Sequence, residues 1–126
     1  LHKQLGYFSR DINQYERMAR YSSYHNYPIE VGLDKCGTGL DEATVNFREG
    51  EGTNCKIIDK LPITHQNLDI FKNFRFPIAH LDKNEMKNIA LRNNFYYILK
   101  ESWSCWFPRS GGVPCGVCNM CKERII

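Results

Sequence analysis

The chain has 126 residues, of which 42% are hydrophobic and 25% charged, as expected of one folded domain or part of a larger one and not of a disordered chain. Its net charge of +3 and pI of about 8.5 fall short of the basic range, above about 9, that is typical of nucleic-acid-binding domains. The longest apolar run, 95–99, is far shorter than the roughly 20 residues of a membrane-spanning helix. The polar N-terminus resembles no secretion signal and starts with Leu1, so we expect a fragment of a cytoplasmic protein with no membrane or nucleic-acid partner.

A helix and a short strand are expected first. Asp11 begins a predicted helix that extends to about Ser22 and ends before Pro28. Its apolar residues are spaced for one face: Ile12, Tyr15, Met18, Ala19 and Tyr21. Residues 29–32 then predict a strand.

An insertion is expected near residues 34–62. Residues 34–39 are polar and glycine-rich and predict a loop, and 41–48 predict one or two helical turns. Residues 49–56, rich in Gly, Thr and Asn, predict an exposed segment.

The next helix is expected to begin at Thr64, a residue type that caps helices, and to end near Phe74. Its inward residues are Leu68, Phe71 and Phe74. Residues 76–78 contain a proline and predict extended backbone. We therefore divide the chain into helix and strand elements of an α/β domain, 1–75, and a C-terminal lobe, 76–126.

The C-terminal lobe begins with a capping box of Asp82 and Glu85, which predicts a helix to about Asn93. The inward residues of this helix are Met86, Ile89 and Ala90. Residues 96–99 predict a strand or buried connector, and the chain after Ser102 predicts a loop built around cysteines. Because helices alternate with short strands, the predicted fold class is α/β.

Four of the six cysteines lie near the C-terminus: Cys105, Cys115, Cys118 and Cys121. The last three are separated by two residues each, which lets neighbouring thiolates bind one metal ion, and Gly116 suits the tight turn between them. In a reducing compartment, clustered thiols indicate metal ligands rather than disulfides. We predict a structural zinc site, because four sulfur ligands leave no open position for catalysis.

Two alternatives to zinc remain open. An iron–sulfur cluster also uses the Cys-x2-Cys-x2-Cys spacing, but its bacterial form continues with a further cysteine, whereas residues 122–124 lead to none. The other alternative is four ordinary reduced cysteines. Zinc agrees best with the spacing, and the metal content of the protein decides among the three.

Other features of the sequence have plainer interpretations. The stretch 110–112 resembles part of an ATP-gripping loop and 36–39 part of a nucleotide fingerprint, but a spacer and a plain loop explain them. Aromatic residues at 95–97, with Trp103 and Trp106, are expected to fill the core. The four histidines show no ligand spacing. Three cations either balance the charge of the site or contact a phosphate: Arg109, Lys122 and Arg124.

Residues 76–124 resemble the C-terminal part of the QueC/ExsB family, the 7-cyano-7-deazaguanine synthases of queuosine biosynthesis. The resemblance includes Pro77, the Asp82–Glu85 box, Ser104-Cys105-Trp106, the run 115–121 and Arg124. It implies a partial Rossmann-like domain of the adenine-nucleotide alpha hydrolase kind, in the N-type ATP pyrophosphatase superfamily, with a zinc-bound lobe. Cys105, Cys115, Cys118 and Cys121 match the family's structural zinc ligands.

The resemblance also implies an activity. The family converts 7-carboxy-7-deazaguanine to the nitrile with ammonia and ATP, requires magnesium with the ATP, and commonly forms homodimers. The family's N-terminal ATP loop has no counterpart in these residues, so we expect no catalysis by this part alone. Two alternatives are a QueC-like ATP-dependent enzyme with another substrate, and a non-enzymatic zinc module that binds a partner or RNA.

Overall fold

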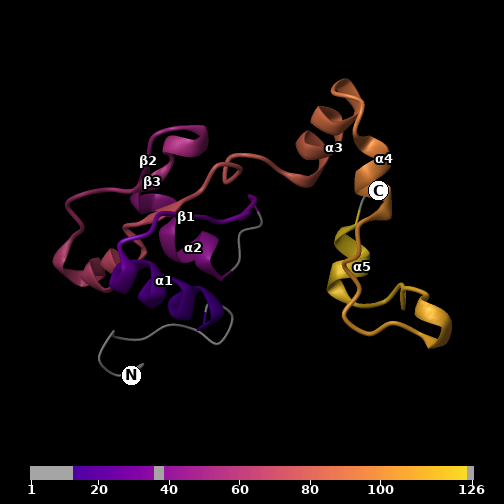
Figure 1. Cartoon of the computed structure of the whole chain (residues 1–126), viewed down its shortest axis with the longest axis horizontal. Coiled ribbons are helices and arrows are strands. Elements are labelled where there is room, and N and C mark those ends of the chain that lie inside the picture. Colours follow the sequence, from indigo (N-terminus) through magenta and orange to yellow (C-terminus); the bar gives the residue numbers. More distant parts are fainter. Residues whose placement is uncertain (1–12, 36–38, 125–126) are drawn as a thin grey trace. The chain divides into compact units, whose positions relative to one another are not determined.

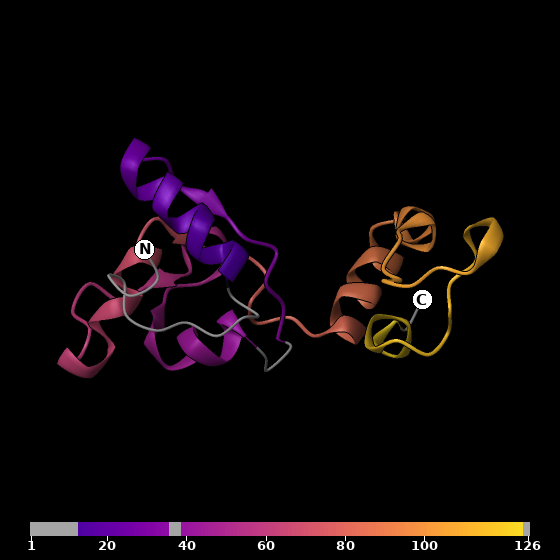
Figure 2. The same cartoon turned by 90° about the horizontal axis from the view of Figure 1, so that it is seen from below.

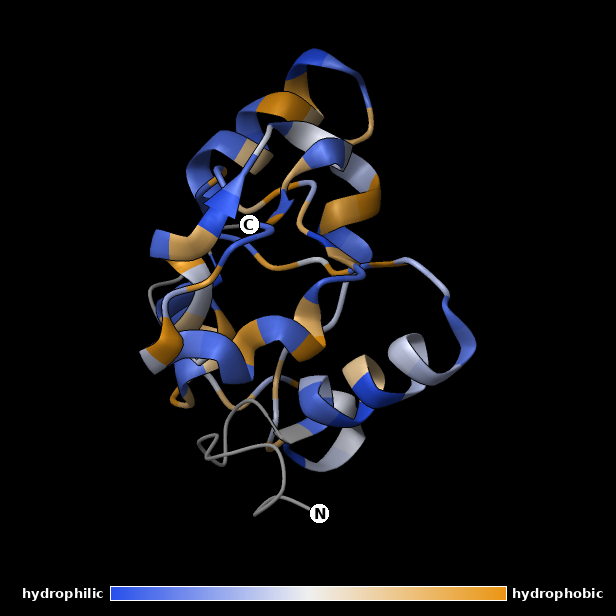
Figure 3. Ribbon diagram, turned by 90° about the vertical axis from the view of Figure 1, so that its left-hand side faces the viewer, coloured by the Kyte–Doolittle hydropathy of each residue, from blue (hydrophilic) through white to orange (hydrophobic). Residues whose placement is uncertain are grey.

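The computed structural model describes residues 13–35 and 39–124 and divides the chain into two compact units, Leu1–His80 and Leu81–Ile126 (Figure 1). The expected helix start at Asp11, with Ile12, lies outside the described residues, as does most of the 36–39 stretch. The sequence places a boundary between 75 and 76, and the assignment of these parts to domains stays a prediction. No helix in the described ranges is long and apolar enough to cross a membrane, and the helices in Figure 3 carry both hydrophilic and hydrophobic residues.

The N-terminal unit combines helices with two small sheets. Helix α1 (Asn13–His25) packs against a 3-10 segment, Ile63–Phe71. Strand β1 (Ile29–Glu30) pairs in parallel with β4 (Phe74–Arg75). Strand β2 (Arg48–Glu49) pairs antiparallel with β3 (Lys56–Ile57). The short helix α2 comprises Leu40–Thr44. The described residues therefore form a mixed helix and strand fold, with two-residue strands in two-stranded sheets.

Three phenylalanines form the centre of this unit. Phe71, Phe74 and Phe76 have no exposed surface, and their rings contact in series at centroid distances of 5.3 and 6.2 Å. The expected inward positions of Leu68, Phe71 and Phe74 are confirmed. Leu40 and Ile57 join this core, so described parts of the 34–62 stretch pack into the unit, whereas the connection between β2 and β3 is largely exposed.

The buried face of α1 differs from the expected apolar face. Ala19 is buried, but Met18 and Tyr21 are 38% and 57% exposed, whereas Glu16 and Ser22 are buried. The polar side chains are accommodated because Glu16 pairs with Arg20 at 3.5 Å and the Ser22 hydroxyl donates to the Tyr27 carbonyl.

Two expectations about residues 64–78 are wrong. Thr64 caps no helix: its hydroxyl bonds the ring of His65 at 2.9 Å. The segment Ile63–Phe71 consists of 3-10 turns interrupted at His65, whose φ of −125° is not helical, and it ends before β4. The chain after Phe76 forms a turn rather than extended backbone, with the Ala79 N–H donating to the Phe76 carbonyl at 3.3 Å.

The C-terminal unit is helical. Helix α3 (Lys83–Arg92) begins with the expected capping box: the Glu85 N–H donates to the Asp82 carboxylate at 2.8 Å, and the Asp82 N–H donates to the Glu85 carboxylate at 2.7 Å. Helix α4 (Tyr96–Glu101) stands where the sequence predicts a strand or buried connector. Asn94, in the left-handed conformation with φ 59°, turns the chain between α3 and α4, which pack together (Figure 2). Helix α5 (Asn119–Glu123) lies in the expected cysteine loop.

Candidate metal centre

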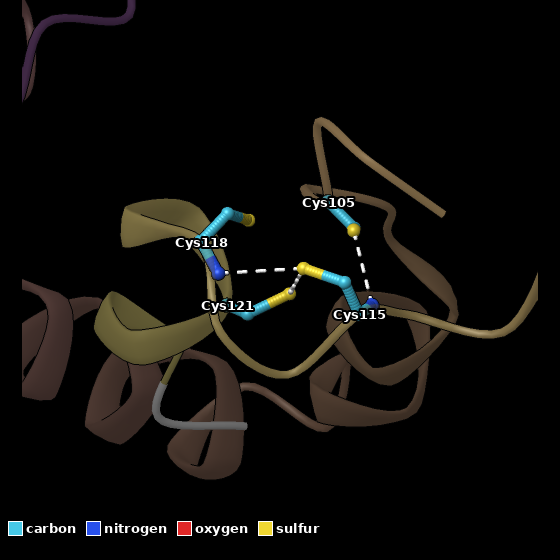
Figure 4. A group of neighbouring side chains, drawn as sticks. All are labelled: Cys105, Cys115, Cys118 and Cys121. Atoms are coloured by element: carbon cyan, nitrogen blue, oxygen red, sulfur yellow. Dashed lines mark hydrogen bonds between the residues drawn. The ribbon is translucent and has the colours of Figure 1, made fainter. Parts of the chain in front are cut away.

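The four C-terminal cysteines gather at one point. The sulfur atoms of Cys105, Cys115, Cys118 and Cys121 all lie within 4.8 Å of one another (Figure 4). Cys105 and Cys115 are buried, and Cys118 and Cys121 are half-buried. All four are free thiols, and no other His, Cys, Asp or Glu of residues 13–35 and 39–124 joins the group.

A hairpin returns Cys115 to Cys105. The Arg109 N–H donates to the Val113 carbonyl at 2.8 Å, and Gly111 and Gly112 take positive φ, 79° and 73°, in the turn between them. The Cys115 N–H consequently lies 3.3 Å from the Cys105 sulfur. The stretch 110–112 therefore closes a hairpin, whereas a phosphate loop needs a strand before it and a helix after it.

A second turn aims the remaining thiols at the same point. Gly116 has φ 76°, which glycine adopts at little cost. The Val117 and Cys118 N–H groups then donate to the Cys115 sulfur at 3.4 and 3.3 Å. Cys118 immediately precedes α5 and Cys121 lies within it, so one helical turn places both sulfurs on the same side, as Figure 4 shows.

Hydrogen bonds and burial shift the pKa values of three of the thiols in different directions. The Val117 and Cys118 N–H groups lower the pKa of Cys115, and the Trp106 N–H is the largest factor that lowers the pKa of Cys118, to about 6. At Cys121, a hydrogen bond with the Gly116 backbone lowers the pKa. Desolvation and hydrogen bonds with the neighbouring thiols raise it by a larger amount, so that the pKa of Cys121 is raised to about 12. The cluster therefore contains one thiol with a lowered pKa, Cys118, beside one with a raised pKa, Cys121.

Polar side chains around the cluster hold its backbone. The Trp103 indole donates to the Cys105 carbonyl at 2.9 Å, and the Arg109 guanidinium donates to the Cys115 carbonyl at 2.8 Å. Arg124, which follows α5, donates to the Ser104 hydroxyl and to the Lys100 carbonyl at 3.3 and 3.1 Å. These cations therefore fasten the loops that present the cysteines.

Of the five aromatic residues expected to fill the core, Phe95 and Tyr96 are half-buried and the other three are exposed. Trp103 and Trp106 are 54% and 61% exposed, and Tyr97 is 67% exposed. In this unit the hydrogen bond of the Trp103 indole, and not burial, explains its position beside Cys105.

The donor set fits a thiophilic metal ion. Zinc–sulfur bonds of about 2.3 Å at a tetrahedral centre place sulfurs about 3.8 Å apart, and the Cys115 and Cys121 sulfurs lie 3.9 Å apart. That separation is well beyond the roughly 2.05 Å of a disulfide. The four cysteines could therefore hold one metal ion, and they would leave no position for a substrate on it.

The comparison with protein families agrees with this geometry. A family model described as "Queuosine biosynthesis protein QueC" matches residues 55–125, more than half of the chain and the whole cysteine cluster. The chain belongs to the QueC family. Comparisons with curated proteins and with solved structures gave no match. The predicted family resemblance is thus confirmed, and the QueC match begins at Cys55, before the segment quoted from the sequence.

Proposed function

We propose that this chain is part of an ATP-dependent ligase of the 7-cyano-7-deazaguanine synthase type, and that this part holds a structural zinc ion. The observation that supports the proposal is that four sulfur atoms within 4.8 Å of one another lie inside the stretch that matches QueC. The substrate class that we propose, a small carboxylated deazaguanine, is the one that the resemblance to this family implies.

Zinc is the metal that we propose for Cys105, Cys115, Cys118 and Cys121. Zinc takes four thiolates in tetrahedral geometry and closes a structural site to water. A zinc ion bound there would displace the protons of the four thiols. It would also cross-link the loop that follows α4 to helix α5. Its contribution would therefore be to folding and not to the reaction.

The proposed reaction converts a carboxylate to a nitrile. ATP would activate 7-carboxy-7-deazaguanine as an acyl adenylate with release of pyrophosphate, and ammonia would displace AMP to give the amide. A second ATP would adenylate the amide oxygen with release of pyrophosphate, and departure of that oxygen in AMP, with loss of both amide N–H protons, would leave the nitrile. We propose a Rossmann-like domain for the binding of ATP and magnesium, a homodimer as the assembled form and the cytoplasm as its location. None of the residues in the cysteine cluster is assigned a catalytic role.

Two measurements on the natural gene product that contains these residues test the proposal. The purified protein is expected to contain one zinc ion per chain by mass spectrometry, and to release the nitrile from 7-carboxy-7-deazaguanine, ammonia and ATP. Iron with visible absorbance would overturn the zinc assignment. Zinc without turnover of this substrate would overturn the ligase assignment; turnover of a different carboxylate would identify a variant enzyme.

A further inference from the structure

The thiols of the cysteine cluster come from two backbone segments. Cys105 lies in the loop that follows α4, whereas the other three, Cys115, Cys118 and Cys121, lie at the end of the hairpin and at the start of α5. One metal ion can bind all four thiols only when the two segments lie side by side. Contacts outside the cluster that hold the segments together therefore lower the entropic cost of binding the ion.

The side chain of Arg124 joins these two segments from outside the cluster. Arg124 follows α5, and its Nη1 atom donates to the hydroxyl of Ser104, the residue before Cys105, at 3.3 Å. Its Nη2 atom donates to the Lys100 carbonyl at 3.1 Å, 24 residues earlier in the chain. The guanidinium therefore connects the end of α5 with the beginning of the loop that presents Cys105.

The Lys100 carbonyl belongs to the last turn of α4. The final carbonyls of a helix have no partner within the helix, and the helix dipole favours a cation beside them. The Ser102 N–H and hydroxyl both donate to the Leu99 carbonyl, and the Arg124 guanidinium donates to the next carbonyl along the chain. Arg124 therefore caps the C-terminus of α4 with the same group that holds Ser104.

We propose that Arg124 is a positioning residue of the metal centre, which holds Cys105 beside α5 and couples binding of the ion to the capping of α4. The identity of the ion as zinc rests on the proposed function, whereas the two hydrogen bonds belong to the chain itself. Coupling between two equilibria is reciprocal, so contacts that favour zinc binding are in turn favoured by zinc. Loss of the ion is therefore expected to loosen the last turn of α4, although α4 contains no ligand.

Zinc affinity, measured by competition with a chromogenic chelator on the natural gene product that contains these residues, tests the positioning role. Arg124→Met is expected to weaken zinc binding about tenfold, since two hydrogen bonds from a charged donor are lost. Arg124→Lys keeps the charge but not the planar fork, so it is expected to weaken binding nearly as much. Lys122→Met, which removes an exposed cation of α5, is the control and is expected to change the affinity less than about twofold. Full affinity in Arg124→Lys, or an equal loss in Lys122→Met, would overturn the proposal.

A double-mutant cycle tests the contact with Ser104. Ser104→Ala removes one of the two acceptors of Arg124, so it is expected to weaken zinc binding about threefold. In the Arg124→Met background the same substitution is expected to have no further effect, because the hydrogen bond is already absent. Circular dichroism of the zinc-loaded variants establishes that each is folded. Additive losses in the double variant would overturn the proposal.

Hydrogen exchange of peptides that cover 96–102 measures the coupling to α4. Removal of zinc from the parent protein is expected to speed exchange there, and in Arg124→Met exchange is expected to be fast even at saturating zinc, with α3 as the unchanged reference. Equal exchange of α4 with and without zinc, or an equal increase in α3 of the variant, would overturn the proposal. Absence of zinc binding would overturn the zinc assignment and this proposal together, whereas the coupling without nitrile formation would overturn only the proposed ligase.

Discussion

The sulfur of Cys115 lies 3.9 Å from the sulfur of Cys121, six residues further along the chain. This separation is close to the edge of a zinc–thiolate tetrahedron, about 3.8 Å, and the turn at Gly116 and the first turn of α5 produce it before any ion is considered. The local backbone thus brings these two thiols to a separation that one zinc ion can bridge.

Cys118→Ser is expected to abolish stable zinc binding and to unfold the region around the cluster. A serine hydroxyl replaces one of four thiolates, and metal binding is coupled to local folding. Zinc per chain, measured by mass spectrometry after dialysis, is expected to fall from about one to a small fraction.

Cys55→Ser is the matched control for that measurement. Cys55 is a half-buried free thiol of the N-terminal unit and is not part of the group of four sulfurs, so its loss is expected to leave the zinc content unchanged. Cys36→Ser, outside the described residues, carries the same expectation from the sequence. If either variant loses as much zinc as Cys118→Ser does, the ligand set is wrong.

Zinc affinity is expected to fall as the pH falls, and to fall more steeply below about pH 6. The metal binds thiolates, so every thiol proton present in the free chain must be released. Cys121, with its pKa raised to about 12, contributes such a proton throughout the neutral range; Cys118, with its pKa lowered to about 6, contributes one only below that pH. Competition with a chromogenic chelator between about pH 5 and pH 8 measures this profile. A constant affinity would contradict the assignment of thiols as ligands.

Signals that depend on residues close together in the sequence predict the metal centre more accurately than they predict the fold. Cysteine spacing with one glycine identifies the group of four, and the side-chain pattern of Asp82 and Glu85 predicts the start of α3, because both depend on interactions between residues close in the chain. The sequence also predicts Cys105 as the fourth ligand, but the hairpin that returns the chain to it, with Arg109 paired to Val113, appears only in the structure.

Long-range packing explains the errors. The run that includes Tyr96 has strand-like residue types, yet it forms α4 because it packs against α3. Glu16 looks like a surface residue of α1 but is buried beside Arg20.

Ile57→Val tests whether residues 34–62 belong to the core. Ile57 is 2% exposed and packs in the cluster with the phenylalanines, so loss of one methyl group is expected to lower the free energy of unfolding of the N-terminal unit by about 1 kcal/mol. Hydrogen exchange of peptides from this unit measures it. Val45→Ala, at a side chain that is 49% exposed, is the control; an equal loss in both variants would argue that Ile57 is not a core residue.

Asp82→Ala is expected to lower the free energy of unfolding of the C-terminal unit by about 1 kcal/mol, because the Glu85 N–H loses its acceptor. Both tryptophans, Trp103 and Trp106, lie in this unit, so tryptophan fluorescence during urea unfolding at fixed zinc concentration reports on it selectively. Asn84→Ala, an exposed substitution in the same helical turn, controls for helix propensity. An unchanged midpoint for Asp82→Ala would show that the cap contributes nothing.

Gly116→Ala is expected to weaken zinc binding about fivefold to thirtyfold, since a left-handed residue with a Cβ costs roughly 1–2 kcal/mol. No atom lies within 4 Å of the added Cβ at Gly116, so the penalty comes from the backbone conformation, φ 76°, and not from a steric contact. Asparagine tolerates this conformation better than alanine, which predicts zinc affinities in the order Gly, Asn, Ala at this position. Gly32→Ala, where φ is not positive and the surrounding space is open, is expected to leave the affinity unchanged. Equal affinities for the Asn and Ala variants, or a loss in Gly32→Ala as large as that in Gly116→Ala, would show that the turn at Gly116 does not preorganise the thiolates.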